Sequence, residues 1–221
     1  GFDSYLNCEV FSRERKFSHN LLAAFNAVDT VSSIVVGIPE STRTTSSAWV
    51  ITMLHEHFHQ IQHNLPDYNS SVLALDLSNG DNTGMWMLNY NFPYEDEKIA
   101  QQFRYLLQSA MLVVLATSDD YFKQDFEEYL DEREKFRNLL SEKDYRYFSF
   151  QLWQEGIARY TEHIMVEMIK DKYEWSGEMK LLNDFKPLDI LYKEMFDKLV
   201  RDALYFRLNQ VKRVAFYTLG A

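Results

Sequence analysis

Residues 55–59 read His-Glu-His-Phe-His, so two imidazoles stand four positions apart and a glutamate follows the first. On a helix, His55 and His59 lie one turn apart on one face and can bind one Zn²⁺ ion together. Glu56 lies about 100° around the helix from His55, so its carboxylate reaches the open coordination position instead of the metal. A carboxylate there is suited to take a proton from a zinc-bound water.

The pattern H-E-x-x-H is short enough to occur by chance in about one chain in a hundred of this length, so its context matters. The surrounding apolar positions and Pro66 predict a helix over residues 48–64. Position 57, usually apolar in such motifs, is His57 here. His63 continues the four-residue spacing, but Leu65 replaces the third histidine of a metzincin motif. We therefore expect His63 either to lie at the surface or to contact a ligand residue without binding the metal itself.

A second segment, residues 153–162, reads Trp-Gln-Glu-Gly-Ile-Ala-Arg-Tyr-Thr-Glu. Together with the first motif it resembles the gluzincin peptidases, including the peptidase-MA-like group and aminopeptidases with a W-x-x-E-G-x-A-x-Y-x-E helix. The chain has one residue fewer between Trp153 and Glu155 than those aminopeptidases. The resemblance implies a zincin-like fold, peptide hydrolysis and Glu155 as the third zinc ligand. The small side chains at Gly156 and Ala158 would let this helix approach the zinc helix closely.

Glu162 is a rival to Glu155 as the third ligand. The two lie on the same helix face but about 10 Å apart along the axis, so both cannot bind one ion. We expect Glu155 to bind, while Glu162 either orients a ligand histidine or is a plain surface carboxylate. An oxyanion donor is also required, and the candidates near the motifs or in the last helix are Arg159, His163, Tyr205 and Tyr217.

Proline is absent between Pro93 and Pro187, and the only glycines in that stretch are Gly156 and Gly177. This pattern predicts long helices, which we place at residues 96–116, 121–140, 148–172 and 187–216. The β-branched residues 31–38 predict a strand, and residues 84–92 a further one. We therefore expect a mainly α protein with a small β-sheet near the N-terminus (α+β). It would be one zincin-like catalytic domain over residues 1–221, with a helical insertion at 95–147 and a C-terminal helical segment at 187–221.

Composition excludes several functions. The chain has 33 acidic and 23 basic residues, for a net charge of −10, and no Lys/Arg stripe, so we expect no nucleic-acid partner. The longest apolar run, Ala110 to Ala116, is far short of the roughly 20 residues of a membrane span. Cys8 is the only cysteine, so no internal disulfide can form. The sequence begins Gly-Phe rather than with Met, which is compatible with the processed part of an exported protein. Without a membrane span, we expect the chain to be soluble. The expected partner is a peptide or protein substrate.

Two other classes compete with a peptidase. A di-iron bundle needs two E-x-x-H motifs, and Glu56 to His59 supplies only one. A catalytically inactive zincin-like scaffold that retains zinc is the stronger alternative. Glu56 argues against it, since a structural zinc site needs no base. The strand at Ile34–Val36 is either an edge on which a peptide lies or a cover for the helices.

Overall fold

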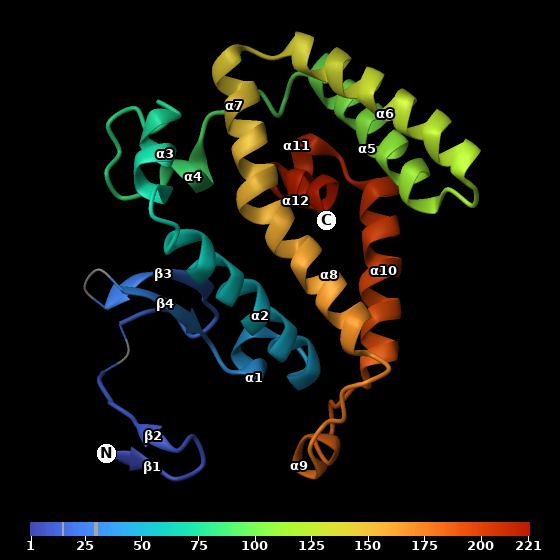
Figure 1. Ribbon diagram of the computed structural model, residues 1–221. Helices are drawn as coiled ribbons and strands as arrows, with labels where there is room; N and C mark the ends of the chain where they lie inside the picture. Colours follow the sequence, from blue (N-terminus) through green and yellow to red (C-terminus); the bar gives the residue numbers. More distant parts are fainter. Residues whose placement is uncertain (15, 29–30) are drawn as a thin grey trace.

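The computed structural model describes residues 1–14, 16–28 and 31–221 (Figure 1). This part of the chain is mainly helical, with two small antiparallel sheets near the N-terminus, as the sequence predicts. In one sheet, β1 (Phe2–Asp3) pairs with β2 (Cys8–Glu9). In the other, β3 (Leu22–Val28) pairs with β4 (Val31–Val36), and Ala24 stands opposite Ile34. The strand at β4 was predicted, whereas β3 was missed.

The helices cover the remainder of the fold. They are α1 (Pro39–Thr42), α2 (Ser46–His63), α3 (Tyr68–Ala74), α4 (Trp86–Asn89), α5 (Glu97–Leu115), α6 (Asp119–Leu139), α7 (Glu142–Gln151), the π-helical turn η1 (Leu152–Gly156), α8 (Ile157–Ile169), α9 (Gly177–Lys180), α10 (Leu188–Tyr205), α11 (Leu208–Val211) and α12 (Val214–Gly220).

Side-chain caps fix where the main helices begin. The hydroxyl of Thr45 accepts a hydrogen bond from the backbone N–H of Ala48 and starts α2. Asp96, Ser118 and Ser141 cap α5, α6 and α7 in the same way. Each cap satisfies backbone donors that the first helical turn leaves free. The predicted helices over 48–64, 96–116 and 121–140 are therefore confirmed within a few residues.

The strand predicted at residues 84–92 is wrong. Trp86 to Asn89 form the helical turn α4 instead. The carboxylate of Asp81 accepts hydrogen bonds at 2.7 Å from the backbone N–H groups of Thr83 and Trp86. This local turn chemistry competes with an extended strand, so the partial alternation of apolar residues was misleading.

The single helix predicted over residues 187–216 is also wrong. Helix α10 ends at Tyr205, where Phe206 adopts an extended conformation (φ −61°, ψ 136°). The chain then turns back through α11 and α12. This reversal places α12 between α8 and α10 and buries Phe216 completely (Figure 1). Full burial of a phenylalanine side chain contributes about 1.5–3 kcal/mol to stability, which favours this reversal.

Helices α7, η1 and α8 follow one another as a single long rod through the middle of the molecule, with α2 crossing beside it (Figure 1). The main core joins aromatic rings from four helices, Phe103, Phe136, Phe148 and Phe216. The helices of residues 95–147 thus share one core with those of 187–221. A second cluster, Ile51, Val166, Leu188 and Leu191, holds α2, α8 and α10 together.

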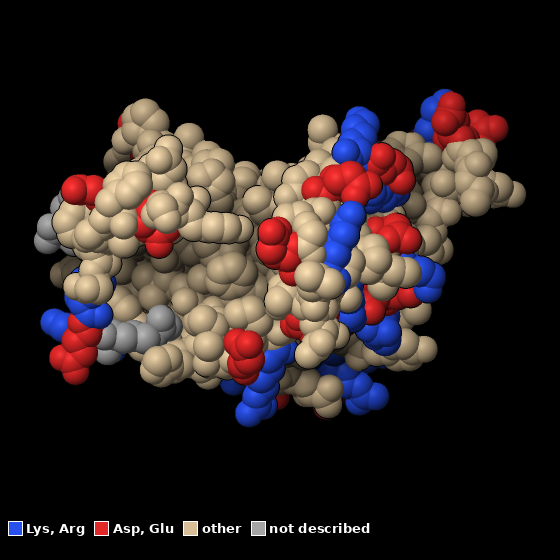
Figure 2. All heavy atoms as spheres, turned by 90° about the horizontal axis from the view of Figure 1, so that it is seen from below, with Lys and Arg blue, Asp and Glu red and all other residues tan. Residues whose placement is uncertain are grey.

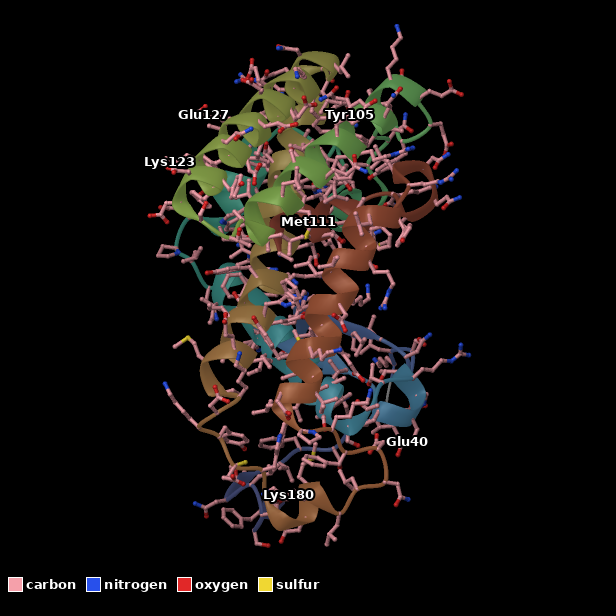
Figure 3. The ribbon with its side chains drawn as sticks, turned by 90° about the vertical axis from the view of Figure 1, so that its right-hand side faces the viewer. Glu40, Tyr105, Met111, Lys123, Glu127 and Lys180 are labelled. Carbon is pink, nitrogen blue, oxygen red and sulfur yellow. The ribbon has the colours of Figure 1, made fainter. Side chains whose placement is uncertain are left out.

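The α5–α6 hairpin has one buried and one solvated face. Met111 lies where α5 meets α10, while Lys123 and Glu127 stand on the outer side of α6 (Figure 3). On the face seen in Figure 2, acidic and basic side chains are interspersed rather than gathered in one basic patch. Across the described ranges, no helix combines the length and apolarity needed to cross a bilayer.

Candidate metal centre

The predicted ligands come from two elements that lie against each other. His55 and His59 project from α2, and Glu155 from the π-helical turn η1. In this turn the backbone N–H of Ile157 bonds the carbonyl of Leu152, one residue further back than in an α-helix. Such wide turns inside long helices occur often at functional sites. The sequence did not predict it.

The three side chains converge on one point. The Nε2 atoms of His55 and His59 lie 3.1 Å apart, and Oε2 of Glu155 lies 3.7 and 3.6 Å from them. A tetrahedral ion with bonds of about 2.0–2.2 Å needs ligand atoms about 3.3–3.6 Å apart. The separation of 3.1 Å lies just below that range, and those of 3.6 and 3.7 Å lie at or just above its upper end. Two imidazoles and one carboxylate, with ligand atoms all within 4.8 Å of one another, therefore fit a single divalent cation.

Two glutamines support His59 from behind. Oε1 of Gln62 lies 2.8 Å from Nδ1 of His59, and the amide nitrogen of Gln154 lies 3.2 Å from the same atom. Gln62 also donates from Nε2 to the backbone carbonyls of Trp153 and Gln154. When Nδ1–H donates to Gln62, Nε2 is left with its lone pair toward the metal position. Gln62 therefore both orients the ligand and fastens α2 to η1.

These glutamines were missed by the sequence analysis. Gln62 stands three residues after His59, a spacing that brings side chains together on one helix face, and this signal could have found it. Gln154 directly precedes Glu155, and no spacing rule places it against His59. Its contact depends on the π-helical turn.

Glu162 supports the other histidine. Its Oε1 lies 2.5 Å from Nδ1 of His55, on the side of the ring away from Glu155. The contact is an ion pair by distance, although Nδ1 makes no well-aligned hydrogen bond. Of the two roles left open for Glu162, the structure therefore favours the one that orients a ligand histidine over the plain surface carboxylate.

The charges in this cluster perturb one another strongly. Burial alone would lower the pKa of His55, but the carboxylates of Glu155 and Glu162 outweigh it and raise this pKa to about 9. Burial alone would raise the pKa of Glu155, but His55 and His59 hold it at about 2. The pocket thus stabilises positive charge among buried carboxylates, which is the condition that also favours a bound divalent cation.

Glu56 lies in a different environment from Glu155. It is only 5% exposed, and burial raises its pKa, although His55 and His59 partly offset the effect. It accepts a hydrogen bond from the backbone N–H of Ala24 in β3. Its Oε2 has no hydrogen-bond partner among the residues that the structure describes. A buried carboxylate with a raised pKa and a free oxygen is suited to general-base chemistry.

The remaining histidines of α2 do not join the cluster. His63 is partly buried rather than at the surface, and its Nδ1 lies 2.9 Å from the hydroxyl of Ser32 in β4. It links α2 to the sheet, and burial lowers its pKa. His57 is exposed and pairs with Gln60 at 3.1 Å. A polar residue at position 57 is therefore tolerated because it faces solvent.

The candidate oxyanion donors separate into two groups. Tyr217 is buried, and burial together with the charge of Glu155 raises its pKa, so its hydroxyl stays protonated. That hydroxyl accepts a hydrogen bond from Nε of Arg213 at 2.8 Å. The guanidinium of Arg159 lies 5.9 Å above the Tyr217 ring. Arg213, which sequence reasoning missed, adds a positive charge on this side of Glu155.

His163 and Tyr205 are less favourably placed. His163 is partly buried, and burial together with the charge of Arg159 lowers its pKa, while Glu162 only partly offsets the effect. Tyr205 is 74% exposed at the last residue of α10. Tyr160, on the same helix as His163, is 48% exposed. Of the four candidates, Tyr217 is the buried one whose pKa the charge of Glu155 helps to raise.

Comparisons with known proteins add no relative. No family model matches this sequence, no curated protein matches it, and no solved structure matches the fold. The function of this chain must therefore be inferred from its two motif segments and from the geometry of His55, His59 and Glu155.

Proposed function

We propose that this chain is a metal-dependent peptidase of the gluzincin type, with a zincin-like fold and a peptide or protein substrate. The observation that carries the proposal is the meeting of His55, His59 and Glu155. They come from segments 96 residues apart, and their ligand atoms have separations suited to one tetrahedral ion. Glu56, adjacent in sequence to the first ligand, supplies a base that a purely structural metal site would not need.

Zinc is the proposed ion because two imidazoles and one carboxylate form a common catalytic zinc set with one position left open. When bound, Zn²⁺ supplies a Lewis acid that polarises the scissile carbonyl and lowers the pKa of water. Gln62 and Glu162 hold the Nδ1 sides of His59 and His55, which keeps the Nε2 lone pairs directed at the ion.

Glu56 handles the proton in this proposal. Its free Oε2 accepts a proton from the attacking water and then delivers it to the nitrogen of the leaving amine. The pKa of this carboxyl is raised by burial, which makes Glu56 a stronger base than an exposed glutamate. The hydroxyl of Tyr217, polarised by Arg213, is the proposed donor to the carbonyl oxygen.

The test compares the parent with Glu56→Gln, both loaded with one equivalent of zinc and offered a mixture of unstructured peptides. Cleavage would be followed by mass spectrometry. The amide has nearly the same shape but cannot take the proton, so we expect a loss of about 10²–10⁴-fold with zinc retained. The matched control is Glu40→Gln, an exposed glutamate of α1 labelled in Figure 3, which should cleave like the parent.

Two outcomes would contradict the proposal. If the parent binds zinc but cleaves none of the peptides, the chain is a metal-retaining binding or scaffold protein. If Glu56→Gln cleaves as fast as the parent, Glu56 is not the base.

A further inference from the structure

A concave site lies beside the metal centre, with Trp153 in its wall, but none of its lining residues is a proposed metal ligand. It is a solvent-open cavity of about 710 Å³ between the segment 65–75, which contains α3, and the segment 137–153, which contains α7. Its walls are mainly apolar, with Tyr68, Val72, Phe150 and Trp153 among them. Its volume is within the range of about 300–1,000 Å³ typical of small-molecule sites.

Two arginines give this apolar cavity a cationic side. Arg137 and Arg146 both line it, and among the described residues no carboxylate lies within 4 Å of either guanidinium. Nε of Arg146 is buried and has no hydrogen-bond partner among the residues that the structure describes. The guanidinium of Arg137 lies over the Tyr145 ring at 5.2 Å, a stacking that leaves its N–H edge free to bind an anion.

Two acidic residues also line the cavity, and both have other surroundings. Glu142 is exposed in the first turn of α7, where its charge favours the helix N-terminus. Asp67 is exposed at the start of α3. Water solvates both carboxylates. The guanidinium groups of Arg137 and Arg146, which line the cavity and have no carboxylate partner among the described residues, are the cationic groups that a ligand there would meet.

We propose that this cavity binds an apolar monocarboxylate, with a medium-chain fatty acid as its occupant. The aliphatic body would lie against Tyr68, Val72 and Trp153, and the carboxylate would accept hydrogen bonds from Arg137 and Arg146. An Arg–carboxylate pair is charge-assisted and can be bidentate, so it offers both affinity and orientation. The apolar walls exclude a strongly polar anion such as free phosphate. This proposal does not rest on the peptidase function.

The experiment is calorimetric titration of the full chain with decanoate below its critical micelle concentration. Decanol, which has the same ten-carbon chain length but no charge, is the control ligand. We expect saturable binding of decanoate and at least tenfold weaker binding of decanol. Arg146→Gln and Arg137→Gln should each weaken decanoate binding by about 10–100-fold, since each removes a charge-assisted hydrogen bond. Lys143→Gln is the matched control, because it removes a positive charge from α7 outside the cavity and should leave the affinity unchanged.

Val72→Trp provides a second variant that does not depend on charge. The larger ring would occupy the apolar space, so decanoate binding should be lost while the helical circular dichroism of the parent is kept. The proposal is overturned if the parent does not bind decanoate, if decanol binds equally well, or if both arginine variants bind like the parent.

Discussion

Gly156, the last residue of the turn that carries Glu155, lies directly against Gly220, the last residue of α12. A Cβ atom built on Gly220 would stand 2.5 Å from Cα of Gly156, and one built on Gly156 would stand 2.7 Å from Cα of Gly220. The obstructing atoms are backbone, so neither side can yield by rotating a side chain. The C-terminal helix therefore holds the π-helical turn in place and, through it, Glu155, the proposed third ligand.

We expect Gly220→Ala to destabilise the fold by about 1–3 kcal/mol, the usual cost of inserting an extra methyl into a closely packed site. The change would otherwise be neutral or favourable, because alanine suits a helix better than glycine. Urea unfolding of the metal-free chain measures the effect. Gly177→Ala is the control, since a Cβ there meets nothing within 4 Å, and its unfolding curve should match the parent's. Equal curves for both variants would show that the two glycines do not pack as described.

The two carboxylates of the long helix should differ in their effect on metal affinity. Glu155→Ala removes a ligand and leaves two histidines, too few for a stable catalytic site. Glu162→Ala removes only the partner of His55 Nδ1, a loss that typically costs about 10–100-fold in affinity. Competition with a zinc chelator would rank them. If Glu162→Ala released zinc more readily than Glu155→Ala, the ligand set proposed for this site would be wrong.

Gln62 should affect the metal site through His59 and through its bonds to the backbone carbonyls of Trp153 and Gln154. Gln62→Leu keeps a similar volume but leaves Nδ1 of His59 without its acceptor, so we expect zinc affinity to fall by about 10–100-fold. The control is Gln60→Leu, two residues earlier on α2, whose amide donates to the backbone carbonyl of Ser32 instead. Chelator competition should show little change for Gln60→Leu. Equal zinc affinity in the two variants would remove Gln62 from the support of the site.

The sequence predicted the parts of the site that depend on local spacing. His55, Glu56 and His59 could be placed on one helix because a capped, apolar-faced segment surrounds them, and α2 forms where it was expected. Glu155 was reached only through a family resemblance, because no periodicity relates residues 96 positions apart. The structure places it against both histidines.

Other features could not be read from the chain. The π-helical turn and the contact of Gly156 with Gly220 depend on the packing of α12, which itself requires the break at Phe206. An uninterrupted apolar pattern through this break gave no signal for it. Likewise, the partner of Glu56 is Ala24 of β3, a strand that lacked a recognisable boundary in the sequence.

The last prediction concerns the stability of the metal-free chain as a function of pH. The pKa of His55 is raised from 6.5 to about 9, so its favourable contribution to folding is complete below pH 6.5 and is lost as pH rises through 9. The pKa of Glu155 is lowered from 4.5 to about 2, so its contribution is complete above pH 4.5 and is lost as pH falls through 2. These two groups therefore favour the metal-free fold most strongly between pH 4.5 and 6.5.

With a chelator present, we expect the free energy of unfolding of the parent to fall between pH 6.5 and 9 relative to His55→Gln, by up to about 3 kcal/mol. The variant cannot titrate at this position, so any slope that other groups cause should appear in both proteins and cancel in the difference. Urea unfolding at intervals of half a pH unit measures it. Zinc binding requires the same imidazole without its proton, so zinc affinity should rise over the window in which the metal-free fold weakens. If the free energy of unfolding changed in parallel for parent and variant from pH 6.5 to 9, the buried carboxylates around His55 would not hold its proton. That outcome would contradict the idea that the charges of this cluster favour a bound cation.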